Sequence, residues 1–220
     1  MGQPVVRVNG GVKEAVSLFL VQHRGVLSII DTGIAGSAKR ILDALEKAGR
    51  KPEDVRQIVL THCHGDHAGD AKALKEATGA MVVAGAEDVA VIEGTGEYPR
   101  PVDRVMRTVY ESLTRYPRLP VDRAVSEPEH LDGGLVALPA PGHTAGHIAV
   151  HAPDLDTIFV GDLVWHLGPL RPSWRRVTQD PERNRESIHR IAALAASKIV
   201  PGHGSPVTGE RLSALAAKLR

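Results

Sequence analysis

Short apolar runs alternate along the chain with segments in which apolar residues recur every three or four positions. The run Val26–Ile30 is β-branched and apolar, which predicts a buried strand. The apolar spacing over 37–48 predicts a helix that ends at Gly49. By the same criteria we expect strands at 5–8, 15–22, 58–60 and 81–83, and another helix at 68–78. This alternation of strands and helices is typical of a layered α/β fold.

The pattern changes between residues 98 and 120. Apolar residues from Val102 to Leu113 fall on one helical stripe, and Pro117 and Pro120 end the segment. We interpret 98–120 as a helical insert that packs on the core, covers a site as a lid or contacts a second subunit. Beyond it we expect strands at 135–138, 148–151, 158–160 and 199–200, and helices at 183–196 and 210–219. No linker rich in Gly, Ser and Pro interrupts the chain, so a single domain over 1–220 is expected.

Composition and charge exclude several classes of protein. The 220 residues are 42% hydrophobic and 24% charged, as in soluble globular proteins. The net charge of +1 provides no overall basic surface for nucleic acid. Cys63 is the sole cysteine, so no intramolecular disulfide forms. No secretory signal or membrane-spanning run is visible. We therefore expect a cytoplasmic protein with a small-molecule substrate, no membrane or nucleic-acid partner, and a homodimer as an open alternative.

Histidine is the unusual component, because its 11 residues outnumber Phe, Trp and Tyr together. Three of them lie in the string T-H-C-H-G-D-H, directly after the predicted strand 58–60. In an extended backbone His62 and His64 point to the same side, which suits one metal ion. Asp66 and His67 follow Gly65, where the chain turns into a helix, and can face a second ion. The string therefore predicts a metal site.

Three further candidate ligands follow later predicted strands. His143 lies in P-G-H, Asp162 in V-G-D and His203 in P-G-H-G. Loops at the carboxyl ends of strands are where open α/β sheets assemble their sites. A catalytic metal site usually takes three protein ligands and leaves a position for water. These segments are expected to supply the ligands that the first string lacks.

The successive motifs resemble those of the metallo-β-lactamase-fold hydrolases. I-I-D-T-G, T-H-C-H-G-D-H-A-G, P-G-H-T-A-G-H, V-G-D and V-P-G-H-G occur in that order over residues 26–204. The resemblance implies an α/β fold, a four-layer αβ/βα sandwich with two facing mixed β-sheets. With Asp162 as a bridging aspartate, the sequence resembles the glyoxalase II, lactonase and phosphodiesterase branches more than the true β-lactamases.

The resemblance also implies a ligand set. It assigns one ion to His62, His64 and His143, a second ion to Asp66, His67 and His203, and a bridging role to Asp162. The implied cofactor is two divalent ions, with zinc favoured and iron or manganese as alternatives. Asp66 would also be catalytic, by orienting the nucleophile. Asp31 and His147 would hydrogen-bond to ligands or to nearby backbone without binding an ion themselves.

The implied function is hydrolysis of a small ester-like substrate, a thioester or a lactone, by a metal-bridging hydroxide. Three rivals are an iron-dependent persulfide dioxygenase with a single ion, a phosphodiesterase or nuclease of the same fold, and a non-catalytic metal-binding module. Trp165 and His166, which closely follow Asp162, and Tyr110 on the apolar stripe are candidate substrate contacts. The identity of the substrate does not follow from these motifs.

Overall fold

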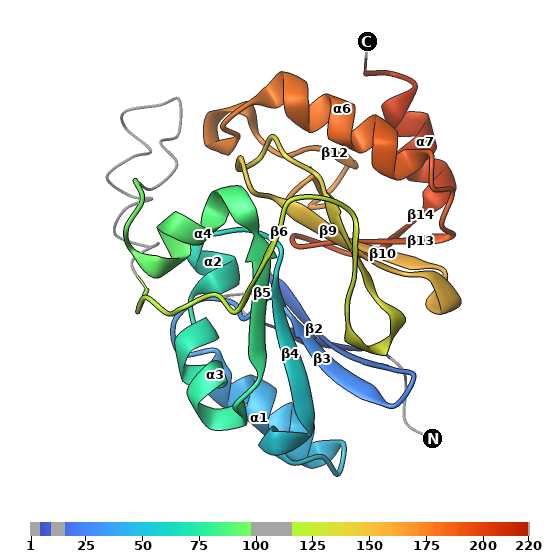
Figure 1. Cartoon of the computed structure of the whole chain (residues 1–220). Coiled ribbons are helices and arrows are strands. Elements are labelled where there is room, and N and C mark those ends of the chain that lie inside the picture. Colours follow the sequence, from blue (N-terminus) through green and yellow to red (C-terminus); the bar gives the residue numbers. More distant parts are fainter. Residues whose placement is uncertain (1–4, 10–15, 98–115, 220) are drawn as a thin grey trace.

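Two β-sheets face each other, and helices cover the outer face of each (Figure 1). The computed structural model describes residues 5–9, 16–97 and 116–219. The first sheet has the strand order β1 (Val5–Asn9), β2 (Ser17–His23), β3 (Val26–Ile30), β4 (Val55–Leu60), β5 (Met81–Gly85) and β6 (Arg123–Val125). The second has the order β14 (Val207–Thr208), β13 (Lys198–Pro201), β10 (Thr157–Gly161), β9 (Ile148–Ala152), β8 (Val136–Pro139) and β7 (Glu129–His130).

Both sheets are mixed. In the first, β1, β2 and β3 pair antiparallel, whereas β3 to β6 run parallel. In the second, β10 and β13 are parallel and the other pairs are antiparallel. The helices are α1 (Ala38–Lys47), α2 (Gly65–Ala68), α3 (Ala71–Thr78), α4 (Ala86–Glu93), α6 (Pro181–Ala192) and α7 (Gly209–Ala216). The expected four-layer αβ/βα sandwich is confirmed.

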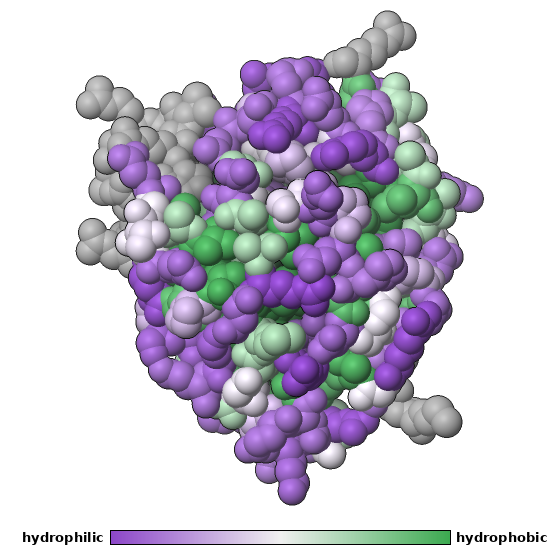
Figure 2. Space-filling model, viewed as in Figure 1, coloured by the Kyte–Doolittle hydropathy of each residue, from purple (hydrophilic) through white to green (hydrophobic). Residues whose placement is uncertain are grey.

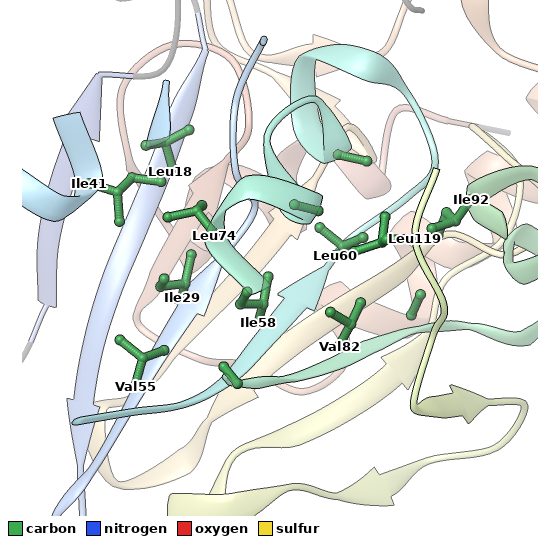
Figure 3. Close-up of a cluster of buried hydrophobic side chains, with 14 of the residues drawn as sticks. Leu18, Ile29, Ile41, Val55, Ile58, Leu60, Leu74, Val82, Ile92 and Leu119 are labelled. Carbon is green, nitrogen blue, oxygen red and sulfur yellow. The ribbon is translucent and has the colours of Figure 1, made fainter. Parts of the chain in front are cut away.

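The first sheet is buried on both faces because its strands place apolar residues in successive positions. On β2, Leu18 and Leu20 join the core beneath the helices, whereas Phe19 and Val21 face the second sheet. Figure 3 shows the core under the helices, where Ile41 of α1 and Leu74 of α3 lie over the strands. The period of two along each strand therefore fills two core layers at once.

The second sheet repeats this arrangement. On β10, Phe159 points inward, with its ring centroid 5.1 Å from that of Phe19, while Ile158 and Val160 pack with the residues of α6 and α7. Ile188 of α6 is fully buried in this third layer. Hydrophilic residues cover much of the face in Figure 2, which is expected where helices turn their polar sides to solvent.

Two helical predictions need correction. The helix expected at 68–78 is two helices, α2 and α3, because the chain breaks at Gly69 and Asp70. The helix expected at 183–196 begins earlier, at Pro181, where the Asp180 side chain caps the amides of the first turn, and it ends at Ala192. Helix α4 was not predicted, since its apolar residues are not confined to one face.

The predicted insert falls largely on residues that the structure does not describe. The stripe Val102 to Leu113 lies outside the described residues, and residues 116–120 form no helix. Its role as a lid, core element or dimer contact, and the single-domain expectation, stay predictions. Within the described parts of the chain, no helix has the length and apolar character needed to cross a membrane.

Three connections meet at one edge of the sandwich. Strands β4, β10 and β13 end there, and each runs into a segment that carries His or Asp. The antiparallel turn from β8 to β9 reaches the same edge, since the amide of Ile148 donates to the Thr61 carbonyl at 2.8 Å. The fold thus brings together the four motifs that carry the candidate ligands.

Candidate metal centre

The first motif places two histidines side by side where β4 ends. His64 keeps an extended backbone, with φ −68° and ψ 145°, immediately before α2 begins at Gly65. Nε2 of His62 lies 3.0 Å from Nδ1 of His64, and both side chains are buried. Between them Cys63 turns to the opposite side and packs into the core under the helices. The alternation expected from an extended backbone is therefore present.

His143 joins this pair from the second sheet. It lies in the turn between β8 and β9, is fully buried, and places Nε2 2.9 Å from Nδ1 of His64. His62, His64 and His143 form a group in which one nitrogen from each side chain could bind the same ion. We call these three residues the first ligand group.

Asp66, His67 and His203 make the second ligand group. Nε2 of His203 lies 3.4 Å from Nε2 of His67 and 3.3 Å from Oδ2 of Asp66. Both histidines are buried, whereas the Asp66 side chain is 29% exposed. Asp66 is therefore the member of this group most open to an arriving molecule.

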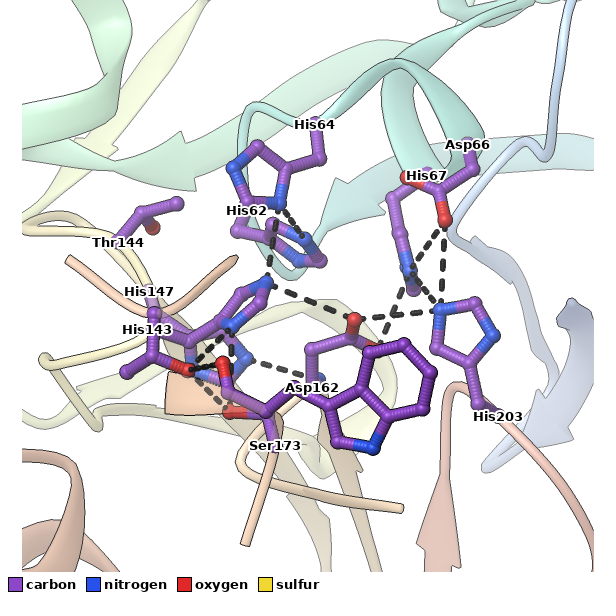
Figure 4. Close-up of polar contacts among 12 residues, drawn as sticks. His62, His64, Asp66, His67, His143, Thr144, His147, Asp162, Ser173 and His203 are labelled. Atoms are coloured by element: carbon purple, nitrogen blue, oxygen red, sulfur yellow. Dashed lines mark hydrogen bonds and ion pairs between the residues drawn. The ribbon is translucent and has the colours of Figure 1, made fainter. Parts of the chain in front are cut away.

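Asp162 lies between the two groups (Figure 4). Its Oδ2 is 3.5 Å from Nε2 of His143 and 3.2 Å from Nε2 of His203. Its Oδ1 is 3.3 Å from Nε2 of His67. A third potential ion-binding set, His62, His67 and Asp162, overlaps both groups. One carboxylate is thus within reach of both candidate ion positions.

The donor atoms fit divalent ions. Two nitrogens bound to one tetrahedral zinc at about 2.0–2.1 Å would lie about 3.3 Å apart, and the imidazole nitrogens here are 2.9–3.4 Å apart. The centre also needs close backbone approach at Gly202. A Cβ atom there would lie 2.6 Å from Cε1 of His67 and 2.7 Å from Oδ1 of Asp162. Only glycine fits against these two side chains without displacing them.

The first ligand group is held in the form that binds metal. Burial, together with the neighbouring histidines, lowers the pKa of His62 well below its ordinary value. Burial likewise lowers the pKa of His64 to about 4 and that of His143 to about 3. All three imidazoles are therefore neutral at pH 7, and each keeps a lone pair that an ion can accept.

The second ligand group behaves differently because it contains the carboxylate of Asp66 and lies beside those of Asp162 and Asp31. Burial disfavours the charged form of His203, yet Asp162 and Asp66 raise its pKa to about 10. Burial also opposes protonation of His67, but Asp162, Asp31 and Asp66 raise its pKa well above the ordinary value. Without an ion, protons on these histidines balance the carboxylates. A bound cation would take their place.

Asp31 and His147 contact this centre from outside the two groups. Oδ2 of Asp31 lies 2.8 Å from Nδ1 of His67, and Oδ1 accepts a hydrogen bond from the Thr61 amide at 2.8 Å. Nε2 of His147 accepts from the backbone amide of Asp162 at 3.1 Å. Each contact fixes the orientation of a candidate ligand or of the backbone that carries it.

Three residues near the ligands, Ser173, Thr178 and Asp88, were missed from the sequence. Ser173 lies with its Oγ 3.2 Å from Nδ1 of His143, and Thr178 lies 2.8 Å from Ser173 Oγ. Asp88 of α4 accepts hydrogen bonds from the loops that carry His62, His64 and His143. No local motif marks these residues, because their partners are distant along the chain.

The candidate substrate contacts are placed unequally. The Trp165 ring centroid lies 5.0 Å from that of His203 and 5.4 Å from that of Trp174. Nδ1 of His166 contacts the Ser205 carbonyl at 2.9 Å, and its amide donates to the His203 carbonyl. Tyr110 lies outside the described residues. Trp165 is thus the candidate whose ring stands beside a ligand.

The chain is similar in sequence to known proteins. The sequence profile of the metallo-beta-lactamase superfamily matches residues 11–203. Metallo-beta-lactamase domain-containing protein 1 of Mus musculus is 31% identical over 182 residues, which cover 81% of this chain and 59% of the relative. A hydroxyacylglutathione hydrolase of Cereibacter sphaeroides is 30% identical over 183 residues, which cover 81% and 58%. The chain thus spans less than two thirds of the length of both relatives.

A solved structure agrees over nearly the whole length. The crystal structure of TTHA1623 in a di-iron-bound form has a TM-score of 0.76 and 25% sequence identity to this chain. The match covers 96% of this chain and 98% of that one.

Proposed function

Because the chain belongs to the metallo-β-lactamase superfamily, we propose that it is a hydrolase that binds two divalent ions and cleaves a small ester-like substrate, a thioester or a lactone. Metal-dependent hydrolysis in general follows from the family and from the His and Asp groups. The number of ions and the ester-like substrate are the proposed part. The hydroxyacylglutathione hydrolase among the relatives supports a thioester.

The observation that carries the proposal of two ions is the position of Asp162. Its Oδ2 lies within 3.5 Å of both His143 and His203, one from each ligand group. A carboxylate so placed is the ordinary means of holding two cations a few ångströms apart. Zinc suits the mixed imidazole and carboxylate donors. The di-iron form of TTHA1623 supports iron as the alternative.

When bound, the ions supply a water that ionises near neutral pH and a positive charge that polarises the bond to be cleaved. The chain's own residues position what reacts. Asp66 is partly exposed, and the neighbouring His67 and His203 hold the pKa of its carboxyl well below the ordinary value although desolvation acts in the opposite direction. It is therefore ionised at pH 7 and can accept a hydrogen bond from the attacking water.

The hairpin of β11 (Val164–Trp165) and β12 (Arg171–Pro172) supplies one wall for the substrate. Trp165 stands beside His203, and Trp174 continues the aromatic surface outward with 48% of its area exposed. An indole pair excludes water from one side and offers apolar contact to an acyl or leaving group. We propose that this pair binds the non-reacting part of the substrate.

Two measurements on one preparation test the function. Protein purified without chelators is analysed for metals, and hydrolysis is then assayed with a hydroxyacylglutathione thioester, a small lactone and a phosphodiester. We expect two equivalents of metal per chain and turnover of the thioester or the lactone that ceases on chelation and returns with added zinc. One equivalent of iron with oxygen uptake on glutathione persulfide would instead identify a dioxygenase. Two bound ions without turnover of any ester would contradict the proposed substrate class.

A further inference from the structure

Asp88 joins the two loops that carry the first ligand group, although it belongs to neither. It lies on α4 and is 1% exposed. Its Oδ2 accepts hydrogen bonds from the Cys63 amide at 2.9 Å and from the Thr144 hydroxyl at 2.6 Å. Its Oδ1 accepts from the Gly146 amide at 2.9 Å. Both carboxylate oxygens are therefore used.

The partners of Asp88 flank the ligands themselves. Cys63 stands between His62 and His64, and Thr144 directly follows His143. The first loop continues from β4 of the first sheet, and the second connects β8 to β9 of the second sheet. A backbone hydrogen bond from Ile148 to Thr61 also links these loops. Asp88 adds a connection at the histidines, where small displacements change the distance between nitrogens.

Close packing fixes the carboxylate in place. A Cβ atom on Gly146 would lie 2.3 Å from the Asp88 amide nitrogen and 2.8 Å from its Cγ. A Cβ atom on Gly85, at the start of α4, would lie within 3 Å of the Gly146 carbonyl oxygen. The loop therefore touches the backbone of α4 directly. A longer acid at position 88 would not fit without displacing the loop.

Burying the negative charge of Asp88 costs free energy, so packing alone does not explain a carboxylate at this position. Among the described residues, no Lys or Arg forms an ion pair with Asp88, so hydrogen bonds from Cys63, Thr144 and Gly146, including one from the Cys63 side chain, offset its burial. Replacing a buried charged group and its partners by apolar residues often leaves the stability of a fold unchanged or raises it. A carboxylate, however, can accept hydrogen bonds from several donors in a fixed plane. This geometry suits a side chain that holds two loops at a constant distance from each other.

We propose that Asp88 is a positioning residue that sets the distance between the His62–His64 pair and His143, and thereby the affinity of the first ligand group for its ion. This rests on the proposed function, because it requires that the group binds an ion. Asp88 itself touches neither ion nor substrate. It acts through the backbone of Cys63 and through Thr144 and Gly146.

Two substitutions test this, one at each end of the connection. In Asp88→Asn an amide replaces one oxygen, so at least one backbone amide loses its acceptor. In Thr144→Val the hydroxyl donor is lost with little change in volume. We expect each to weaken binding of one of the two ions by about 10–100-fold, the range for residues that orient metal ligands. Binding of the other ion should stay near the wild-type value. Affinities are measured by competition with a chromophoric chelator, and the visible spectrum of the cobalt-loaded protein reports the geometry.

Matched controls separate positioning from stability. Asp122 accepts from the Val82 amide at 2.8 Å, and Thr78 donates to the Leu74 carbonyl at 2.6 Å, both away from the ligand loops. Asp122→Asn and Thr78→Val should lower the melting temperature of the metal-free protein without changing ion affinity or the cobalt spectrum. Thr144→Val keeps the test decisive if Asp88→Asn fails to fold.

The outcomes distinguish this proposal from the proposed function. If the wild type takes up no ion, both fail. If the wild type takes up two ions and the Asp88→Asn and Thr144→Val variants bind them with unchanged affinity and spectrum, only the role of Asp88 is overturned. If these variants, like the controls, differ from the wild type only in a lower melting temperature, the positioning role of Asp88 is likewise overturned.

Discussion

Nδ1 of His67 lies 2.8 Å from Oδ2 of Asp31, and both side chains are buried. This contact leaves Nε2 of His67 as the atom that faces Asp162 and His203. Asp31 also holds the Thr61 amide and hydroxyl, so it joins the end of β4 to the histidine that follows it. The orientation of one candidate ligand thus depends on a carboxylate 36 residues earlier.

Asp31→Asn should weaken binding of the ion at the second ligand group. The amide is nearly isosteric, but it does not provide the negative charge that raises the pKa of His67 and orients its ring. We expect a loss of about 10–100-fold in affinity for that ion, measured by chelator competition. Asp43→Asn, at an exposed partner of Lys39, is the control and should bind as the wild type does. Unchanged affinity in Asp31→Asn would remove this residue from its assigned role.

Asp66→Asn should reduce hydrolysis far more than it reduces stability. The substitution removes the ionised, partly exposed oxygen that we propose orients the attacking water. A positioned group of this kind contributes about 100-fold to 10,000-fold in rate, so kcat should fall by at least about 100-fold. Steady-state kinetics on metal-saturated protein measure this. Wild-type kcat with a full complement of metal would show that Asp66 has no catalytic part.

Gly202→Ala should displace ligands of the second group. The added methyl would lie 2.6 Å from His67 and 2.7 Å from Asp162, which is too close for either side chain to stay in place. We expect metal content to fall toward one equivalent per chain. The control is Gly36→Ala, where the methyl meets no atom within 4 Å and only the positive φ of 88° is unfavourable. That variant should melt earlier but keep its metal. Two full equivalents in Gly202→Ala would contradict the proposed arrangement.

Ion binding should release protons and strengthen as pH rises. His203, with a pKa of about 10, and His67, with a pKa raised well above its ordinary value, are protonated in the metal-free protein at pH 7.5. His62, His64 and His143 are already neutral and release none. About two protons should therefore leave these histidines when the second ion binds. For each proton displaced, the affinity for the ion rises about tenfold per pH unit, as long as the pH is below the pKa of the group that holds the proton. Calorimetry in buffers of different ionisation enthalpy counts the protons, and a pH-independent affinity would refute the assignment.

Trp174→Ala should impair substrate binding and leave the metal centre intact. The ring is 48% exposed and packs on Trp165, so its loss removes apolar contact at the wall. The loss of about 1–2 kcal/mol of favourable apolar burial on substrate binding corresponds to a rise in KM of about 5–30-fold. Leu194→Ala removes a side chain of similar exposure, 44%, beyond the end of α6, and is the control. Equal kinetics for both variants would show that the Trp pair does not bind substrate.

The sequence predicted the strands of the sandwich well because each buried strand carries its own apolar signal. Val26–Ile30 coincides with β3, and the runs at 81–83 and 158–160 lie within β5 and β10. The ligand motifs were equally visible, since each joins His or Asp to Gly at the end of such a run. The structure brings all seven candidate ligands to one place, while the assignment of these residues to two ions stays a prediction.

The surroundings of the ligands could not be predicted in the same way. Asp88, Ser173 and Thr178 contact the ligand loops only after the two sheets have come together, and no spacing in the chain records those contacts. Helix α4, which carries Asp88, has no single apolar face. Long-range contacts of this kind follow from tertiary packing and leave little local pattern.

The origin of the ligands has a consequence for how the protein acquires metal. Among the residues that the structure describes, each of the three potential ion-binding sets combines a histidine or aspartate from 62–67 with a residue from 143–203. In a chain emerging from the ribosome, none of these three sets is therefore complete until the second half has been synthesised and has docked on the first. Metal loading would then be a late event in biogenesis, and retained metal would mark molecules whose two halves have assembled.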